Sequence, residues 1–173
     1  APSFRELLDL SSTRLNEFLS NYAIEKRPVI KAALLSIDKH TPELCDLESP
    51  AKWGFDSYAW FHIEEVPGGT DVYCCPNFDS EYETWRNEIA TRRQAAEQKA
   101  LIEECLANEH HWSFRRSAGQ PAIINVAYGL IAASLTELTD GFIYSSDGAW
   151  DYERFPARAQ DFFSWYFRPE MAI

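Results

Sequence analysis

Two short apolar runs separated by a glycine turn constrain the fold more than any other feature of the chain. Residues 58–65 and 71–75 are rich in aromatic and β-branched side chains, and they flank the turn sequence Pro67-Gly-Gly-Thr70. Pro76 ends the second run. Runs of this kind joined by a glycine-containing turn are typical of a β-hairpin. The sequence therefore predicts an antiparallel pair of strands near its middle.

Two helices are expected before this hairpin. Apolar residues at helical spacing indicate a helix over residues 3–22, and Ser3 followed by Glu6 three positions later is a capping-box pattern at its start. After Pro28, which can open a helix, a second apolar stripe continues to Ile37. Two amphipathic helices joined by a short connection predict an αα-hairpin.

Three more helices are expected after the hairpin. A long one begins at Asp79 or Ser80 and runs to about His110, but its middle is nearly all polar. A polar middle means that this helix either projects from the body or breaks. The other two cover residues 121–139, the most apolar segment and the expected core helix, and the aromatic residues 158–167.

The remaining segments are short. Residues 41–57 are rich in Pro, Asp, Glu and Ser and predict a surface loop, residues 111–116 and 142–144 predict short strands, and Gly141 is expected to cap the core helix. Because helices and strands do not alternate as βαβ units, we expect an α+β fold. The length favours a single domain over residues 1–173, with helices packed on a small, mainly antiparallel sheet.

The chain is acidic, with 27 Asp and Glu against 16 Lys and Arg and a net charge of −11. This balance argues against nucleic acid and anionic membranes as partners, because both bind basic surfaces. No apolar run approaches the roughly 20 residues that a membrane span needs. Most of the excess charge lies in residues 41–85, which hold ten carboxylates against Lys52 alone. This acidic segment is either a solubilising surface or a patch that steers a basic partner.

Aromatic side chains are interleaved with the carboxylates of the acidic segment. Trp and Tyr edged by carboxylates are typical of a protein-binding surface for a partner rich in Arg and Lys. The expected partner-binding residues are Asp56, Tyr58, Trp60, Glu64, Glu65, Asp71, Tyr73, Asp79, Glu81 and Glu83. The sequence leaves the oligomeric state open.

The four cysteines, Cys45, Cys74, Cys75 and Cys105, lack the CxxC spacing of a zinc or redox site. We expect reduced, mostly buried thiols and a cytoplasmic protein, although a periplasmic location with disulfides stays open. The sequence also lacks a glycine-rich nucleotide loop, a GxSxG motif and an HExxH motif. No cofactor, no metal and no catalytic residue is therefore expected.

One enzymatic alternative remains from the residues. Asp147 and Asp151 are paired carboxylates, and His110 and His111 are adjacent histidines. Together with a histidine, the two aspartates could form a small metal-assisted hydrolase. Another alternative is an adaptor that binds a partner other than a toxin.

The stretch LTELTDGFIYSSDGAWDYERFP, residues 135–156, resembles a segment of bacterial immunity proteins that are encoded beside secreted toxins of polymorphic-toxin, type VI and contact-dependent systems. The acidic, aromatic-rich character without a catalytic motif is similar as well. The resemblance implies stoichiometric binding of a cognate toxin and assigns no site residue. A nuclease is the first expectation for that toxin, because its basic substrate groove would attract an acidic inhibitor.

Overall fold

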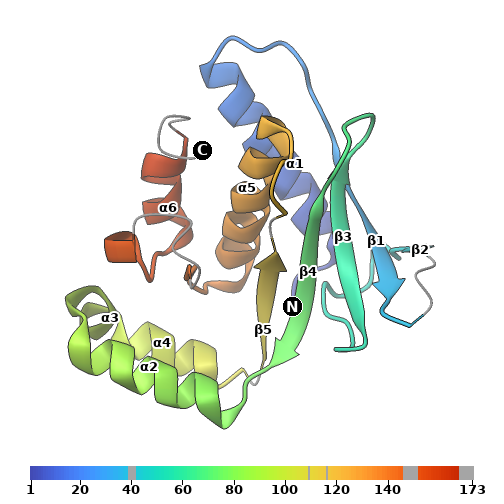
Figure 1. Cartoon of the computed structure of the whole chain (residues 1–173). Helices are drawn as coiled ribbons and strands as arrows, with labels where there is room; N and C mark the ends of the chain where they lie inside the picture. Colours follow the sequence, from blue (N-terminus) through green and yellow to red (C-terminus); the bar gives the residue numbers. More distant parts are fainter. Residues whose placement is uncertain (39–41, 109, 116, 146–151, 168–173) are drawn as a thin grey trace.

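The structure, a computed structural model, describes residues 1–38, 42–108, 110–115, 117–145 and 152–167. Within these residues, six α-helices and a five-stranded antiparallel sheet confirm the α+β fold expected from the sequence (Figure 1). The helices are α1 (Phe4–Asn21), α2 (Asp79–Thr91), α3 (Arg93–Glu97), α4 (Lys99–Leu106), α5 (Ala122–Thr139) and α6 (Ala159–Tyr166), with a short 3-10 helix, η1 (Tyr152–Arg154). The strands are β1 (Ile30–Ser36), β2 (Pro42–Leu44), β3 (Ser57–Ile63), β4 (Thr70–Pro76) and β5 (His110–Arg115), in the sheet order β2-β1-β3-β4-β5.

The hairpin predicted in the middle of the chain is the β3–β4 pair. Its register places Ala59 opposite Val72 and Phe61 opposite Thr70. The turn between the strands includes Gly68 at a φ of 95°, a conformation that favours glycine. The predicted strand at 111–116 is also present as β5, which pairs with β4 over six positions.

One face of the sheet forms the core. Alternate residues of β3 and β4 are buried there, as the period of a strand requires. Helices α1 and α5 lie along this face, and α6 packs on α5 (Figure 1). α5 is the predicted core helix. By length and composition it is also the one described helix that could cross a membrane, yet 67% of its 18 residues are buried inside the protein.

α1 begins as predicted, with a capping box in which the Ser3 hydroxyl accepts from the Glu6 N–H and the Glu6 carboxylate accepts from the Ser3 N–H. The loop that follows β2 accepts hydrogen bonds from two more N–H groups in the first turn of α1. The N–H groups of Phe4 and Arg5 donate to the carbonyls of residues 49 and 47, at 3.0 and 2.8 Å. The surface loop predicted at 41–57 is therefore anchored to a helix end, apart from the three residues that form β2.

The helix predicted after Pro28, and with it the αα-hairpin, is wrong. The run from Ile30 to Ser36 is strand β1, which pairs with β3 at seven positions from Ile30 opposite Ile63 to Ser36 opposite Ser57. A short, nearly continuous apolar run fits a buried strand as well as a helix, so periodicity could not separate the two. Pairing with a distant strand decides the conformation.

The long helix expected from residue 79 to about 110 breaks, which was one of the two outcomes left open. Arg92 adopts an extended conformation with φ −121° and ψ 128°, and the chain folds back through α3 into α4. The three helices form a second small apolar cluster, to which α2 contributes Trp85, α3 contributes Ala95 and α4 contributes Ile102. This helical insertion, residues 77–108, connects the neighbouring strands β4 and β5.

Two details after α5 differ from expectation. The left-handed residue that ends α5 is Asp140, at a φ of 51°, and not Gly141. Asp tolerates this conformation better than most residues because its short polar side chain can bond locally. The strand expected over 142–144 is reduced to a single bridge between Ile143 and Ala157.

Candidate partner-binding face

The sheet has a second face that no described helix covers (Figure 1). We call it the outer face. Cross-strand register and the alternation of buried residues assign its side chains. Its members are Lys31, Ala33, Leu35, Pro42, Leu44, Tyr58, Trp60, His62, Asp71, Tyr73, Cys75, His111, Ser113 and Arg115.

One row of directly opposed residues crosses all five strands of the outer face. It runs Leu44, Ala33, Trp60, Asp71 and Arg115 from β2 to β5. Residues opposed in this way lie close enough for their side chains to touch. The row is apolar on β2, β1 and β3, and it ends in a carboxylate and a guanidinium on β4 and β5.

A second row lies beside the first. Pro42 is opposite Leu35, Leu35 is opposite Tyr58, and the rings of Tyr58 and Tyr73 stack with centroids 5.5 Å apart. Ser113 follows Tyr73 on β5. The centre of the outer face is thus an apolar and aromatic surface of two adjacent rows.

The aromatic side chains of this face are held by their neighbours. A Cβ at Gly69 would come within 2.7 Å of the Trp60 indole, so the absence of a side chain at Gly69 lets the ring lie on the backbone. The Arg115 guanidinium lies over the Tyr73 ring, 5.9 Å from its centroid. Tyr58 and Tyr73 are half-buried against each other, and Trp60 is half-buried over the Gly69 backbone. Rings held in this way lose little conformational freedom when they bind a partner.

Asp71 is the one acidic side chain at the centre of this surface. It is half-buried, and burial raises the pKa of its carboxyl group although Arg115 acts in the opposite direction. Within the described part of the chain, its carboxylate forms no ion pair and no hydrogen bond. A cationic group of a partner beside this carboxylate would stabilise its charged form.

The structure brings together four of the ten residues expected to bind a partner and separates the other six. Tyr58, Trp60, Asp71 and Tyr73 meet on the outer face. Glu64 and Glu65 lie in the β3–β4 turn, at one end of the sheet. The other four lie towards the opposite end: Asp56 before β3, and Asp79, Glu81 and Glu83 on α2.

Two of these separated carboxylates have partners beyond their immediate neighbours in the chain. Glu81 accepts a hydrogen bond from the Phe78 N–H at 2.8 Å at the start of α2. Burial would raise its pKa, but this bond and others outweigh burial and lower it. The Glu64 carboxylate lies 2.7 Å from the Lys31 ammonium. The contact with Lys31 lowers the pKa of Glu64.

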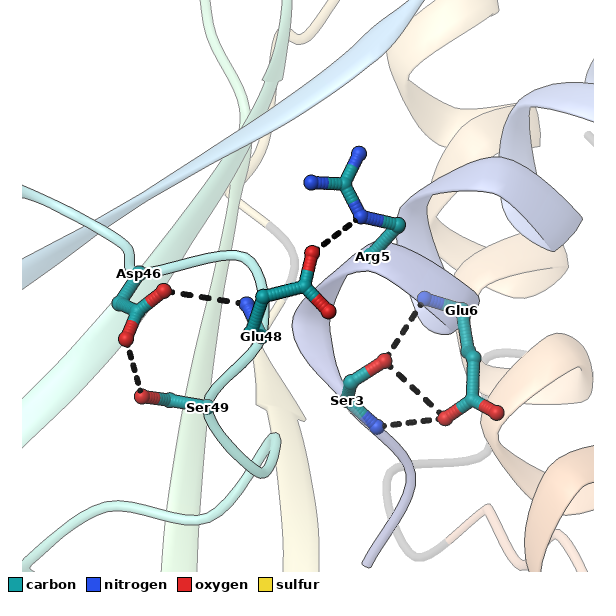
Figure 2. A network of polar contacts seen from close by, with 6 residues as sticks. All are labelled: Ser3, Arg5, Glu6, Asp46, Glu48 and Ser49. Carbon is teal, nitrogen blue, oxygen red and sulfur yellow. Dashed lines mark hydrogen bonds and ion pairs between the residues drawn. The ribbon is translucent and has the colours of Figure 1, made fainter.

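Two more carboxylates of the acidic segment serve the start of α1 (Figure 2). The Arg5 guanidinium donates to Glu48 at 2.6 Å, and Asp46 accepts from the Glu48 N–H and the Ser49 hydroxyl. The acidic segment is therefore distributed between the β2–β3 loop, the outer face and α2, and it does not form one continuous acidic patch.

Sequence reasoning missed the β1, β2 and β5 side chains of the outer face. Leu44 is 94% exposed on the edge strand, and Leu35 lies beside Tyr58. The sequence does not indicate either residue, because the apolar spacing of residues 28–37 predicts a helix and β2 has only three residues. Arg115 joins the face through its register with Asp71. No local signal in the sequence indicates these cross-strand neighbours.

The residues of the hydrolase alternative are only partly described. Asp147 and Asp151 lie outside the described residues. The ring Nδ1 of His110 bonds the Asn108 carbonyl and that of His111 bonds the Asn77 side-chain oxygen, both at 2.8 Å. Among the residues that the structure describes, no three His, Cys, Asp or Glu side chains are arranged to hold a metal ion.

The cysteines are less buried than expected. Cys74 is buried and points to the core, whereas the other three are half-buried. Burial raises the pKa of all four thiols, that of Cys45 to about 11. Thiols with raised pKa values are poor nucleophiles at neutral pH.

Comparison of the chain with family models, with curated proteins and with solved structures gives no match.

Proposed function

We propose that this protein binds and neutralises a cognate secreted bacterial toxin, and that it does so through the outer face of its sheet. The observation that carries the proposal is that face itself, because no described helix covers it and it presents Trp60 and the stacked rings of Tyr58 and Tyr73. The resemblance of residues 135–156 to toxin-immunity proteins supplies the kind of partner. Its binding would be stoichiometric and requires no catalytic residue.

The chemistry of the outer face suits a protein partner. Tyr and Trp are enriched among the residues that contribute most to protein–protein affinity, since they bury large areas and still form polar contacts. Trp60, Tyr58 and Tyr73 lie at the centre of the face, and Leu44 is 94% exposed at its edge. A central aromatic cluster with an apolar edge is the arrangement that excludes water when a partner binds.

The net charge supports a basic toxin. A charge of −11 creates a negative potential around the whole molecule and speeds the approach of a basic partner. Because the carboxylates of the acidic segment lie in several places, this steering comes from the whole surface together with the rim of the outer face. A nuclease remains the first candidate for the toxin, and the cytoplasm, where its substrate lies, the first candidate for the location.

The experiment is co-expression with the protein encoded by the neighbouring gene, which the proposal expects to be the toxin, read as growth and as co-purification. Leu44→Asp places a charge on the outer face at a fully exposed position, so it should abolish protection and binding without unfolding the protein. Ile24→Asp, at a 42% exposed position between α1 and β1, is the matched control and should protect like the wild type. Equal protection by both variants would place the interface elsewhere. Failure of the wild-type protein to bind that toxin would favour the adaptor alternative.

A further inference from the structure

We propose that Asp71, with the rings of Tyr58, Trp60 and Tyr73 around it, is a binding site for an arginine side chain of the partner. The inference rests on the proposed function for the identity of the partner, but its chemistry comes from the outer face alone. We call this group the Asp71 site.

The register of the strands places Asp71 next to three aromatic residues of the same face. Asp71 lies directly opposite Trp60 on β3, and Tyr73 is two residues further along β4 on the same face. Tyr58 stacks on Tyr73. Burial raises the pKa of the Tyr58 hydroxyl, and the charge of Asp71 raises it further, which places that carboxylate within electrostatic reach of the ring.

Among the described residues this carboxylate has no ion pair, although the charge of Arg115 opposes the rise in its pKa. Arg115 is opposite Asp71 in the register, yet no Arg or Lys nitrogen of the described residues lies within 4 Å of it. The Arg115 guanidinium is instead directed to the Tyr73 ring. A half-buried carboxylate without an ion pair costs stability, so its presence at the centre of an exposed aromatic surface indicates a role in binding.

An arginine fits this site better than other cations. The planar guanidinium stacks on aromatic faces and donates two parallel hydrogen bonds to one carboxylate, whereas the ammonium of lysine is a strongly hydrated point charge. A divalent metal needs several oxygen ligands, and Asp71 is the one carboxylate at this position among the described residues. The Arg115 guanidinium, 5.9 Å from the centroid of the Tyr73 ring, shows that this ring accepts a guanidinium.

The test uses the free protein and small probes. The indole N–H signal of Trp60 is identified in a proton–nitrogen NMR spectrum by its loss in Trp60→Phe. The protein is then titrated with N-acetylarginine amide, N-acetyllysine amide and N-acetylcitrulline amide, of which the last has the shape of arginine without its charge. The arginine probe should give a saturable shift, the lysine probe a weaker one and the citrulline probe none. Asp71→Asn should weaken binding of the arginine probe at least tenfold, and Glu104→Gln, which changes an exposed carboxylate on α4, should leave it unchanged.

Two results would overturn the inference: an equal shift with arginine and citrulline, or arginine binding that survives Asp71→Asn in a folded protein. A parallel measurement of affinity for the toxin that the proposed function expects separates this inference from that function. If Asp71→Asn binds the toxin like the wild type, the Asp71 site is wrong and the toxin-binding function stands. If the arginine probe binds in an Asp71-dependent way but the wild-type protein binds no toxin, the proposed function is wrong and the site stands.

Discussion

The guanidinium of Arg92 lies 2.7 Å from the carboxylate of Glu88, at the point where the predicted long helix breaks. Both side chains are nearly buried, at 12% and 11% exposure. Arg92 also donates to the carbonyl of Phe155 at 2.8 Å, 63 residues away. Gln94 and Gln98 donate to the neighbouring carbonyl of Pro156. These bonds tie the helical insertion to the segment that leads into α6.

Arg92→Leu should therefore destabilise the protein strongly. The change removes the guanidinium that faces the buried Glu88 carboxylate, and breaking a buried ion pair costs about 3–5 kcal/mol. Urea unfolding measures the loss in the free energy of unfolding. Arg93→Leu is the matched control: its i,i+4 pair with Glu97 is exposed, at 91% and 56%, and such pairs contribute roughly 0.3–0.5 kcal/mol. Similar losses in the two variants would mean that Arg92 does not anchor the insertion.

A second prediction concerns the packing of α6 on α5. A Cβ added at Gly129 would lie 2.2 Å from Cζ of the Tyr166 ring, whose hydroxyl donates to the carbonyl of Asn125 at 2.8 Å. Alanine favours a helix over glycine by about 1 kcal/mol. Gly129→Ala should nevertheless lower the free energy of unfolding, because overpacking a core costs about 1–3 kcal/mol and a contact this close lies at the upper end.

Thermal or urea unfolding of Gly129→Ala, Tyr166→Leu and the double variant provides the check. Removing the ring should relieve the clash, so the loss from Gly129→Ala should be smaller in the Tyr166→Leu background. Strictly additive losses would show that the ring and the glycine do not interact.

The sequence predicts those parts of the fold that short-range signals specify. The β3–β4 hairpin has its turn glycines and its two apolar runs, and α1 has its capping box, all within a few residues. β1 could not be recognised in this way, because its conformation depends on pairing with β3. The break at Arg92 depends likewise on the carbonyl of Phe155.

The same reason explains what the sequence indicates about the candidate site. Tyr58, Trp60, Asp71 and Tyr73 belong to one hairpin, so their common face follows from the period of two within each strand. Leu44 and Arg115 reach that face only through the order and register of five strands. Glu81 and Glu83 lie on the helix that the sequence predicts from residue 79, away from the outer face, and Glu81 caps its start.

A third prediction concerns pH. Burial lowers the pKa of the His111 imidazole, His110 lowers it further, and the Glu81 carboxylate opposes both. The unfolded chain binds this proton with a pKa of about 6.5, so between the folded pKa and that value the unfolded state holds more protons. The free energy of unfolding should therefore fall as the pH drops below about 6.5. His111→Gln should flatten this slope in urea unfolding series at pH 5 to 8, and an unchanged slope would assign it to other groups.

The last prediction separates the two interpretations of the acidic segment. Glu43, Glu65 and Glu83 are exposed carboxylates of this segment, and the described contacts give none of them an ion pair. Each reversal to Lys adds two charge units, so the triple variant changes the net charge from −11 to −5. If these groups steer a basic toxin to the outer face, the variant should associate more slowly and with a weaker dependence on salt. Dissociation should change little, because rim charges act mainly on the association rate.

The matched control reverses Asp9, Glu25 and Glu104, three exposed carboxylates outside the acidic segment, and reaches the same net charge. Stopped-flow association at several salt concentrations compares the two triple variants with the wild type. Slower association of the first variant alone places the steering charges near the outer face, since screening limits direct attraction to about 8 Å at physiological ionic strength. Equal slowing of both variants would assign the steering to the charge of the whole molecule. Unchanged association in both would mean that the acidic segment only keeps the protein soluble, and that capture of the partner depends on the aromatic side chains and Asp71.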